Sequence, residues 1–249
     1  MTRVLAALLL AVPVFAAADD KPADKPKTGF VDRTFKNADG STSPYVVFVP
    51  HGYDGTKEYP VILFLHGAGE TKNPKAKKEG KMPAEVGIGP AIKKREKDFP
   101  FVTVIPRAES FGWGAESANA KRALAMLDEV MKEYKIDAKR QYLTGLSMGG
   151  MGTWSIALAH PDRFAAIVPI CGRGDAKQAE KIKDLPCWAF HGDADTSVPV
   201  SGSRDMIEAI KKAGGTPKYT EYPKVGHNSW DPAYAEKELF PWLLEQKKK

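Results

Sequence analysis

The hydrophobic positions of this chain form short, nearly continuous apolar runs separated by longer amphipathic segments. Two β-type runs come first, at 30–35 and 44–50, and the turn-rich segment between them predicts an antiparallel pair. Six further apolar runs follow, at 61–66, 101–106, 142–146, 164–170, 187–191 and 216–222. Because continuous apolar runs are typical of strands buried on both faces of a parallel sheet, we expect a mostly parallel sheet of about eight strands.

Segments of helical length alternate with these runs, as in repeated βαβ units. The clearest helix is expected from Ser117 to Tyr134, where apolar side chains recur every three or four residues and Ser117 is suited to the N-cap. A last helix is expected to carry Leu239, Phe240 and Leu243. The pattern predicts the α/β class, with helices on both faces of the sheet.

The first 18 residues have the features of a secretory signal peptide. Arg3 precedes an apolar run from Val4 to about Phe15, and small residues end the segment at Ala18. A membrane anchor is the alternative, but the run is shorter than the roughly 20 residues that span a bilayer and contains Pro13. With no cysteine near the site for a lipid anchor, we expect cleavage near Ala18, no stable membrane anchor, and a secreted or periplasmic product.

The remaining chain is expected to hold a flexible leader and one domain. Residues 19–28 alternate charges and prolines and predict the leader, so the domain spans 29–249. With 43% hydrophobic and 27% charged residues, the composition excludes a collagen-like, wholly disordered or polytopic membrane protein. The net charge is +6, but the lysines are scattered among acidic residues, so no nucleic-acid partner is expected.

Two cysteines, Cys171 and Cys187, are expected to be buried free thiols. Export makes a disulfide available to the chain. However, Cys171 ends one predicted strand and Cys187 begins another, so parallel strands place the two at opposite ends of the sheet. That separation exceeds the roughly 7 Å limit between the Cα atoms of bonded cysteines.

A candidate nucleophile, Ser147, lies between an apolar strand and a helical stretch in the run Gly145-Leu146-Ser147-Met148-Gly149. A sharp strand-to-helix turn holds such a serine in strained dihedrals, and only glycine fits at the crowded flanking positions. The Met148 N–H would lie at a helix N-terminus, where it is suited to stabilise an oxyanion. The glycine-serine pattern alone occurs by chance in roughly one chain of this length in ten, so its place between strand and helix carries the prediction.

A nucleophilic serine needs a base, which in this kind of fold follows the serine and the acid along the chain. His160, His191 and His227 come after Ser147. His160 ends a helix, where the helix dipole favours it, and His191 lies at a strand end, where it is expected to support its loop. His227 follows the last strand beside a glycine, and we predict that it is the base.

The predicted acid is Asp195, in the run HGDADTSVP. Asp195 lies further past the strand end than Asp193, where the loop can turn back over the sheet edge. Asp193 is expected to brace the turn, since aspartates in such loops bond their own backbone. The predicted role of Asp195 is to remain ionised, fix the tautomer of His227 and stabilise its imidazolium.

A second oxyanion donor is expected in the loop after the third strand, LFLHGAGE. We assign it to the Ala68 N–H, with Gly67 and Gly69 permitting the turn. An ordinary glycine turn is the alternative.

Five motifs occur in order along residues 29–249: LFLHGAGE, YLTGLSMGGMGTW, HPDRFAAIVPICGRGD, HGDADTSVP and GHNSWDPAY. With them the chain resembles secreted α/β-hydrolases of the carboxylesterase, feruloyl-esterase and dienelactone-hydrolase-like group, including bacterial esterases labelled as prolyl-oligopeptidase family. The resemblance implies an α/β-hydrolase fold with a minimal cap, and Ser147, Asp195 and His227 as nucleophile, acid and base. Arg173 stands where relatives often carry glycine, which adds a cation near the strand end.

Three residues are candidates for the substrate pocket. Trp113 lies in the segment 107–116, which should border the site, and Trp230 follows His227 by three residues. Packing alone explains tryptophans at such positions about as often as a role in a substrate pocket does. Arg173 is the third candidate, together with the lysine-rich segment 70–82 as a selector of anionic substrates.

The predicted function is hydrolysis of short-chain, acetyl, aryl or plant-polysaccharide esters through an acyl-enzyme. The expected partner is therefore a small-molecule or polysaccharide-linked ester. No cofactor or metal is expected, because no ligand spacing such as HExxH occurs. The alternatives are a serine peptidase, which a missing propeller segment disfavours, an acyltransferase, and a non-catalytic binding module.

Overall fold

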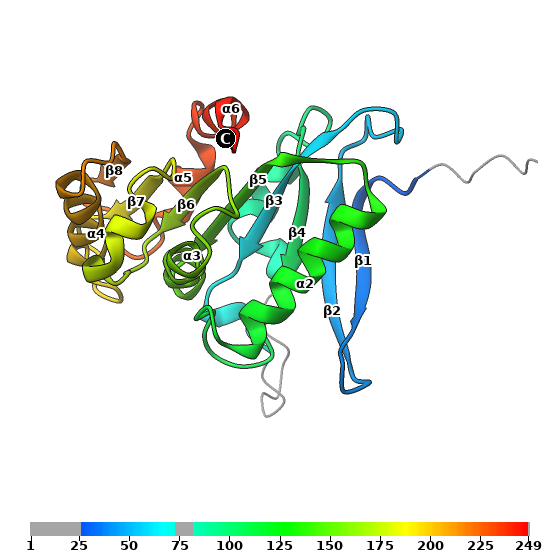
Figure 1. Ribbon diagram of the computed structural model, residues 1–249, viewed down its shortest axis with the longest axis horizontal. Coiled ribbons are helices and arrows are strands. Elements are labelled where there is room, and N and C mark those ends of the chain that lie inside the picture. Colours follow the sequence, from blue (N-terminus) through cyan, green and yellow to red (C-terminus); the bar gives the residue numbers. More distant parts are fainter. Residues whose placement is uncertain (1–25, 73–81, 249) are drawn as a thin grey trace, which may run out of the picture.

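The computed structural model describes residues 26–72 and 82–248, which are built around one eight-stranded sheet (Figure 1). The expected signal peptide at 1–18 lies outside the described residues, as do most of the leader at 19–28 and most of the lysine-rich segment 70–82. None of the helices within the described ranges is long and apolar enough to cross a membrane.

The strand order is β1-β2-β4-β3-β5-β6-β7-β8. β1 pairs antiparallel with β2, and β2 pairs antiparallel with β4, whereas the strands from β4 to β8 run parallel. The prediction of about eight strands in a mostly parallel sheet is confirmed. The strands are β1 Gly29–Lys36, β2 Thr42–Val49, β3 Tyr59–Leu65, β4 Val102–Pro106, β5 Ile136–Leu146, β6 Ala166–Ile170, β7 Trp188–Gly192 and β8 Lys218–Tyr222.

The longest helix, α2, begins after Ser117, whose hydroxyl accepts a 3.1 Å hydrogen bond from the Ala120 N–H. The cap predicted from the sequence is therefore confirmed, since it satisfies an N–H that the first turn leaves without a partner. The helices are α1 Ile88–Lys93, α2 Ala118–Glu133, α3 Met148–Ala159, α4 Ser201–Lys212, α5 Trp230–Ala235 and α6 Leu239–Glu245, with 3-10 helices η1 Ala68–Glu70, η2 Pro83–Glu85 and η3 Ala176–Ile182.

Helices cover both faces of the sheet and close two separate apolar cores. One core joins the sheet to α2, α3, η3 and α4, and the other joins its opposite face to α1, α5 and α6. The central strand β3 is buried at all of its positions. This double covering explains why the central strands are continuously apolar, and it confirms the α/β-hydrolase class of fold.

The carboxyl ends of the parallel strands meet at one edge of the sheet. Leu65 at the end of β3 pairs with Gly145 of β5, and Leu146 of β5 pairs with Ile170 of β6. The loops after β3, β5, β6, β7 and β8 therefore leave this edge together, where open α/β sheets bind their ligands.

Cys171 and Cys187 are both free and buried. Cys171 directly follows β6, whereas Cys187 precedes β7 and bridges to Ile167 near the start of β6. The parallel strands thus separate the two thiols, as predicted.

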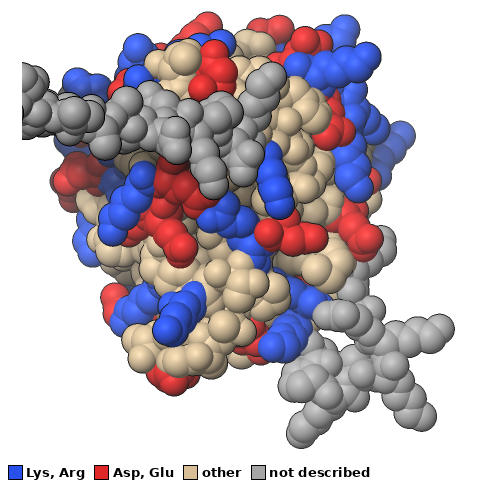
Figure 2. All heavy atoms as spheres, turned by 90° about the vertical axis from the view of Figure 1, so that its right-hand side faces the viewer, with Lys and Arg blue, Asp and Glu red and all other residues tan. Residues whose placement is uncertain are grey.

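Charged side chains of both signs share the molecular surface on the side of β1. Figure 2 shows lysines and arginines interspersed there with aspartates and glutamates. This face carries no large surface of one sign, which is what the scattered lysines of the sequence indicate.

Candidate active site

Ser147 lies in the sharp turn between β5 and α3. Its φ of 53° places a residue with a side chain in the left-handed region, which costs roughly 1–3 kcal/mol where the surroundings enforce it. Its N–H donates to the Ile170 carbonyl at 2.9 Å, which anchors the turn to β6.

The flanking glycines are required by close backbone approach. A Cβ atom at Gly149 would lie 1.9 Å from the Leu65 carbonyl oxygen, and one at Gly145 would lie 2.4 Å from the Gly149 carbonyl oxygen. Neither position has room for a side chain. The turn therefore packs against β3 and leaves the Ser147 side chain partly exposed.

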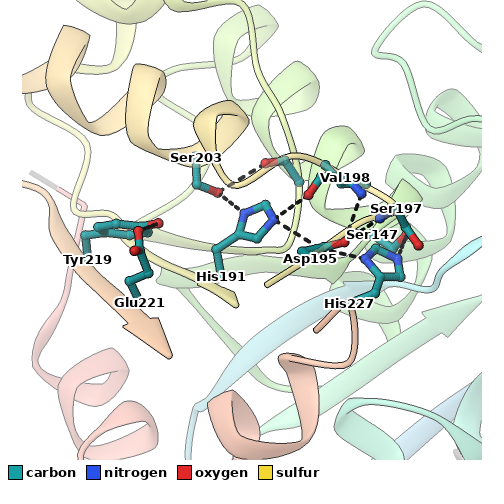
Figure 3. Close-up of polar contacts among 10 residues, drawn as sticks. Ser147, His191, Asp195, Ser197, Val198, Ser203, Tyr219, Glu221 and His227 are labelled. Atoms are coloured by element: carbon teal, nitrogen blue, oxygen red, sulfur yellow. Dashed lines mark hydrogen bonds and ion pairs between the residues drawn. The ribbon is translucent and has the colours of Figure 1, made fainter. Parts of the chain in front are cut away.

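His227, in the loop between β8 and α5, lies against Ser147 at the edge of the sheet where the parallel strands end (Figure 3). Its Nε2 lies 2.8 Å from Ser147 Oγ, and its Nδ1 lies 2.7 Å from Asp195 Oδ2. An ionised carboxylate only accepts, so Nδ1 carries the proton and Nε2 is free to accept from the serine hydroxyl. The three predicted residues thus form one hydrogen-bonded chain.

Asp195 is held in a buried position by its own loop. Its Oδ1 accepts hydrogen bonds from the N–H groups of Ser197 at 2.8 Å and Val198 at 2.9 Å. Burial acts to raise the pKa of Asp195, but the hydrogen bonds from His227, Val198 and Ser197 outweigh it and hold the pKa below its ordinary value. Asp195 is therefore ionised at neutral pH.

The side chain of Asp193 bonds to a different loop from the one in which it lies. Asp193 Oδ1 accepts the N–H of Lys224 at 2.6 Å, whereas the bonds to the backbone of the same loop come from Asp195. The expectation that Asp193 bonds its own turn is therefore wrong. Its side chain points towards the segment after β8, which carries His227, and so joins the two loops.

The loop after β3 is held by a buried histidine that the sequence did not single out for this role. His66 Nδ1 donates to the Gly67 carbonyl at 2.6 Å, and His66 Nε2 accepts from the Ala108 N–H at 2.9 Å. The Trp113 indole N–H donates to the His66 carbonyl at 3.0 Å. These contacts fix the backbone that leads into Ala68.

Of the two predicted oxyanion donors, Met148 directly follows Ser147, and Ala68 lies in the loop after β3, a strand that pairs with β5. Ala68 begins η1 after β3 and is exposed, and Met148 begins α3, so the Met148 N–H has no partner within its own helix. Both assignments stay predictions.

Acid sensitivity is expected from His66. Burial, with a smaller contribution from Arg107, lowers its pKa from 6.5 to about 4, against the opposing hydrogen bond to Gly67. Between these values the unfolded chain binds a proton that the folded protein excludes. The free energy of unfolding should therefore be constant above pH 6.5 and fall by about 3 kcal/mol for His66 alone as the pH approaches 4.

Urea unfolding at a series of pH values tests this expectation. His66→Asn should flatten the pH dependence, although not fully, because burial also lowers the pKa of His191. His160→Gln is the matched control and should leave the slope unchanged, because His160 is exposed and has no recorded side-chain hydrogen bond among the described residues. A slope that His66→Asn does not alter would refute the assignment.

A cleft of about 620 Å³ opens beside Met148. Its apolar surface includes the exposed Phe111, together with Met148 and Met151 of the nucleophile turn and helix. The charged residues that line it are Glu116, Arg173, Asp175 and Lys181.

The three candidates for the substrate pocket lie in different surroundings. Trp113 borders the cleft but is only 1% exposed, so it contributes mainly to packing and to the loop of His66. Arg173 lines the cleft and is exposed. Trp230 lies outside the cleft and packs edge-on against the His227 ring, with 5.5 Å between centroids.

One group of potential metal ligands occurs among the described residues. The ligand atoms of Cys171, Asp195 and His227 lie within 4.8 Å of one another. Asp195 and His227 already bond each other, and burial raises the pKa of the Cys171 thiol to about 12. A protonated thiol is a poor metal ligand, so these residues fit the hydrogen-bonded chain better than a metal site.

The strand order, the strained serine between β5 and α3, and the acid and histidine on later strand ends define an α/β-hydrolase. The model of the Esterase family, described as "Putative esterase", matches residues 40–193. That match covers more than half of the chain, and the chain belongs to this family.

Similar proteins carry esterase names. A probable feruloyl esterase C from Aspergillus terreus is 25% identical over 179 residues, which cover 69% of this chain and 62% of that protein. A bifunctional acetylxylan esterase/xylanase from Neocallimastix patriciarum is 32% identical over 144 residues, covering 53% of this chain and 22% of that protein. The chain thus spans less than two thirds of the length of these relatives.

Solved structures agree on the fold. A thermostable esterase superposes with a TM-score of 0.73 at 33% identity and covers 88% of this chain and 63% of its own. A feruloyl esterase module from Clostridium thermocellum has a TM-score of 0.65 at 20% identity and covers 87% of this chain and 88% of its own. At that identity the second similarity concerns the fold alone.

Proposed function

We propose that the protein is a carboxylic ester hydrolase that acts through Ser147, His227 and Asp195. The observation that carries the proposal is the continuous hydrogen-bonded chain from Ser147 Oγ to Asp195 Oδ2, with the serine held at a strained turn. Membership of the esterase family and the esterase names of the relatives support the same activity.

The reaction proceeds in two steps. His227 Nε2 takes the Ser147 proton as Oγ attacks the ester carbonyl, and the Ala68 and Met148 N–H groups stabilise the tetrahedral anion. His227 then returns the proton to the leaving alcohol, which leaves an acyl-serine. Water attacks the acyl-serine by the same route and frees the acid. Asp195 stays ionised throughout and stabilises the imidazolium of His227.

The proposed substrates are short-chain, acetyl, aryl or plant-polysaccharide esters. The cleft beside Met148 is lined by apolar side chains and by the exposed Phe111, which suits a small or flat acyl group. Two relatives are named for feruloyl and acetylxylan esters, which are esters of this size class. We also propose that the protein is secreted or periplasmic after cleavage near Ala18.

Hydrolysis of p-nitrophenyl acetate, together with labelling by a fluorophosphonate, tests the proposal. We expect turnover of the acetate and a single label that mass spectrometry maps to Ser147. The matched p-nitroanilide distinguishes an esterase from a peptidase, since faster cleavage of the anilide would favour the peptidase. A folded protein that neither turns over nor labels would overturn the proposal and favour a binding module.

Arg173 is expected to favour esters whose acyl group carries a second carboxylate. It has no hydrogen-bond or ion-pair partner among the described residues, whereas Asp175 accepts from the Lys177 N–H and Gln178, and Lys181 donates to Gln178. Arg173→Gln should raise KM for the p-nitrophenyl half-ester of glutaric acid by up to roughly fivefold, the scale of an exposed ion pair.

The neutral p-nitrophenyl valerate is the matched substrate, and its KM should not change. Lys181→Gln is the matched variant. It removes a positive charge from the same cleft, but the Lys181 ammonium already donates to Gln178. Equal effects of Arg173→Gln on both esters would remove the role in anion recognition.

A further inference from the structure

A second buried histidine contacts the carboxylate of Asp195. His191, near the end of β7, has a side chain that is 0% exposed, as is the side chain of Asp195. Its Nε2 lies 3.2 Å from Asp195 Oδ2 and 3.0 Å from the Val198 carbonyl oxygen. Since His227 Nδ1 lies 2.7 Å from the same Oδ2, two imidazole rings converge on one carboxylate oxygen (Figure 3).

The contacts of His191 define where its proton lies. Asp195 Oδ2 and the Val198 carbonyl both accept only, so Nε2 must carry a proton and share it between them. On the other side of the ring, Nδ1 lies 2.8 Å from the hydroxyl of Ser203, a residue of α4. Burial lowers the pKa of His191, so the ring is neutral at neutral pH and Nδ1 carries no proton. The single proton of the Ser203 hydroxyl is shared between Nδ1 at 2.8 Å and the Gly172 carbonyl oxygen at 3.1 Å. The two acceptors that face Nε2 therefore fix the tautomer that points N–H at Asp195.

Asp195 is the anionic group that contacts the His191 ring. Glu221 of β8 is paired with Arg204 of α4 at 2.6 Å, so those two charges offset each other. The other titratable and charged groups around the ring come from three neighbouring elements. The loop before α5 contributes His227, β8 contributes Tyr219 and Glu221, and α4 contributes Arg204.

We propose that His191 is a positioning residue for the reaction, which holds Asp195 Oδ2 towards His227 and offsets part of its negative charge. The inference rests on the proposed function, because it concerns the same Asp195–His227 pair. A hydrogen bond to a carboxylate reduces the charge that a neighbouring cation feels. Without the Nε2–H of His191, Asp195 stabilises protonated His227 more strongly, and the enzyme needs a higher pH before His227 can act as base.

Two substitutions separate this role from simple support of the loop. In His191→Gln the amide nitrogen takes the place of Nε2, so the donor to Asp195 is kept. In His191→Asn the shorter side chain reaches only the place of Nδ1, so the contact with Ser203 is kept and the donor to Asp195 is lost.

The measurement is the pH dependence of kcat and kcat/KM for p-nitrophenyl acetate. His191→Asn should move the acid-side midpoint of kcat/KM to higher pH by about half a unit to one unit. It should also lower kcat roughly tenfold, because Oδ2 is less well held, and leave KM within twofold. His191→Gln should restore both the midpoint and kcat to near the values of the unsubstituted protein.

Ser203→Ala is the control for loop support. It removes the hydroxyl that contacts Nδ1 and the Gly172 carbonyl, and it should lower the Tm. Asp195 and the Val198 carbonyl still hold the proton on Nε2, so the midpoint should not move. If His191→Asn lowers kcat without moving the midpoint, or if His191→Gln behaves like His191→Asn, the positioning role is refuted and His191 only supports its loop.

NMR of the unsubstituted protein with 15N-labelled histidine gives a test that needs no variant and no turnover. The His191 Nε2–H proton should be visible, and its resonance should shift as His227 titrates. A His191 resonance unaffected by that titration would overturn the inference even if the enzyme is active. If the protein shows this coupling but hydrolyses no ester, the proposed function fails, and the contact of both rings with Asp195 stands.

Discussion

Replacing Ser147 with alanine is expected to lower kcat for p-nitrophenyl acetate by roughly 10⁴ to 10⁶-fold. The serine supplies the atom that forms the acyl-enzyme, and no other hydroxyl is recorded at 2.8 Å from His227 Nε2 among the described residues. The backbone strain at Ser147 is retained, because alanine meets the same restriction at a φ of 53°. The Tm should therefore change little.

The measurement compares kcat, Tm and fluorophosphonate labelling in Ser147→Ala and in Ser197→Ala. Ser197 is a matched control, since it is exposed and contributes its N–H, but no recorded side-chain bond, to Asp195. That variant should retain nearly full activity and full labelling. Residual activity of more than about 1% in Ser147→Ala, with the label still bound, would mean that another residue is the nucleophile.

The central strands β3, β4, β6 and β7 could be predicted because burial on both faces forces them to be continuously apolar. The prediction is less complete for the first half of β5, where the sequence run begins at 142 but the strand begins at Ile136. Residues 136–140 are exposed or half-buried, and a register shift next to Tyr59 interrupts their pairing with β3. A partly solvated strand end has no apolar run to reveal it.

Ser147, Asp195 and His227 could be singled out because each follows a strand that ends at the same edge. The glycines beside Ser147 gave a second, steric signal, which the contacts of Gly145 and Gly149 with neighbouring backbone explain.

The supporting contacts could not be predicted in this way, because they join residues far apart in the sequence. The His66 ring bonds the Ala108 N–H 42 residues away, and the Trp113 indole bonds the His66 carbonyl across 47 residues. No local spacing encodes such pairs. The sequence did leave one signal, a histidine at the end of a continuously apolar run, which is costly to bury unless its nitrogens are bonded.

Asp195→Asn is the second substitution with a large expected effect, a loss of about 10⁴-fold in kcat. The amide oxygen would keep the two N–H bonds that Ser197 and Val198 donate to Oδ1. The amide nitrogen would then replace Oδ2 and point N–H groups at His227 Nδ1. It would also lose the hydrogen bond from His191, whose Nε2–H keeps only the Val198 carbonyl as acceptor. His227 would have to accept at Nδ1 and carry its proton on Nε2, where it could no longer take the proton of Ser147.

The control for this prediction is Asp193→Asn, two residues earlier in the same loop. Asp193 accepts one N–H bond, from Lys224, which an amide oxygen can also accept. Its kcat should remain within about threefold of the unsubstituted protein, the scale of a surface change. Comparable losses of kcat in both variants would mean that the activity depends on the position of the loop and not on the charge of Asp195. A large loss of kcat confined to Asp195→Asn, with KM preserved, would instead show that His227 requires the carboxylate. An amide at this position can neither hold the proton on Nδ1 nor stabilise the imidazolium.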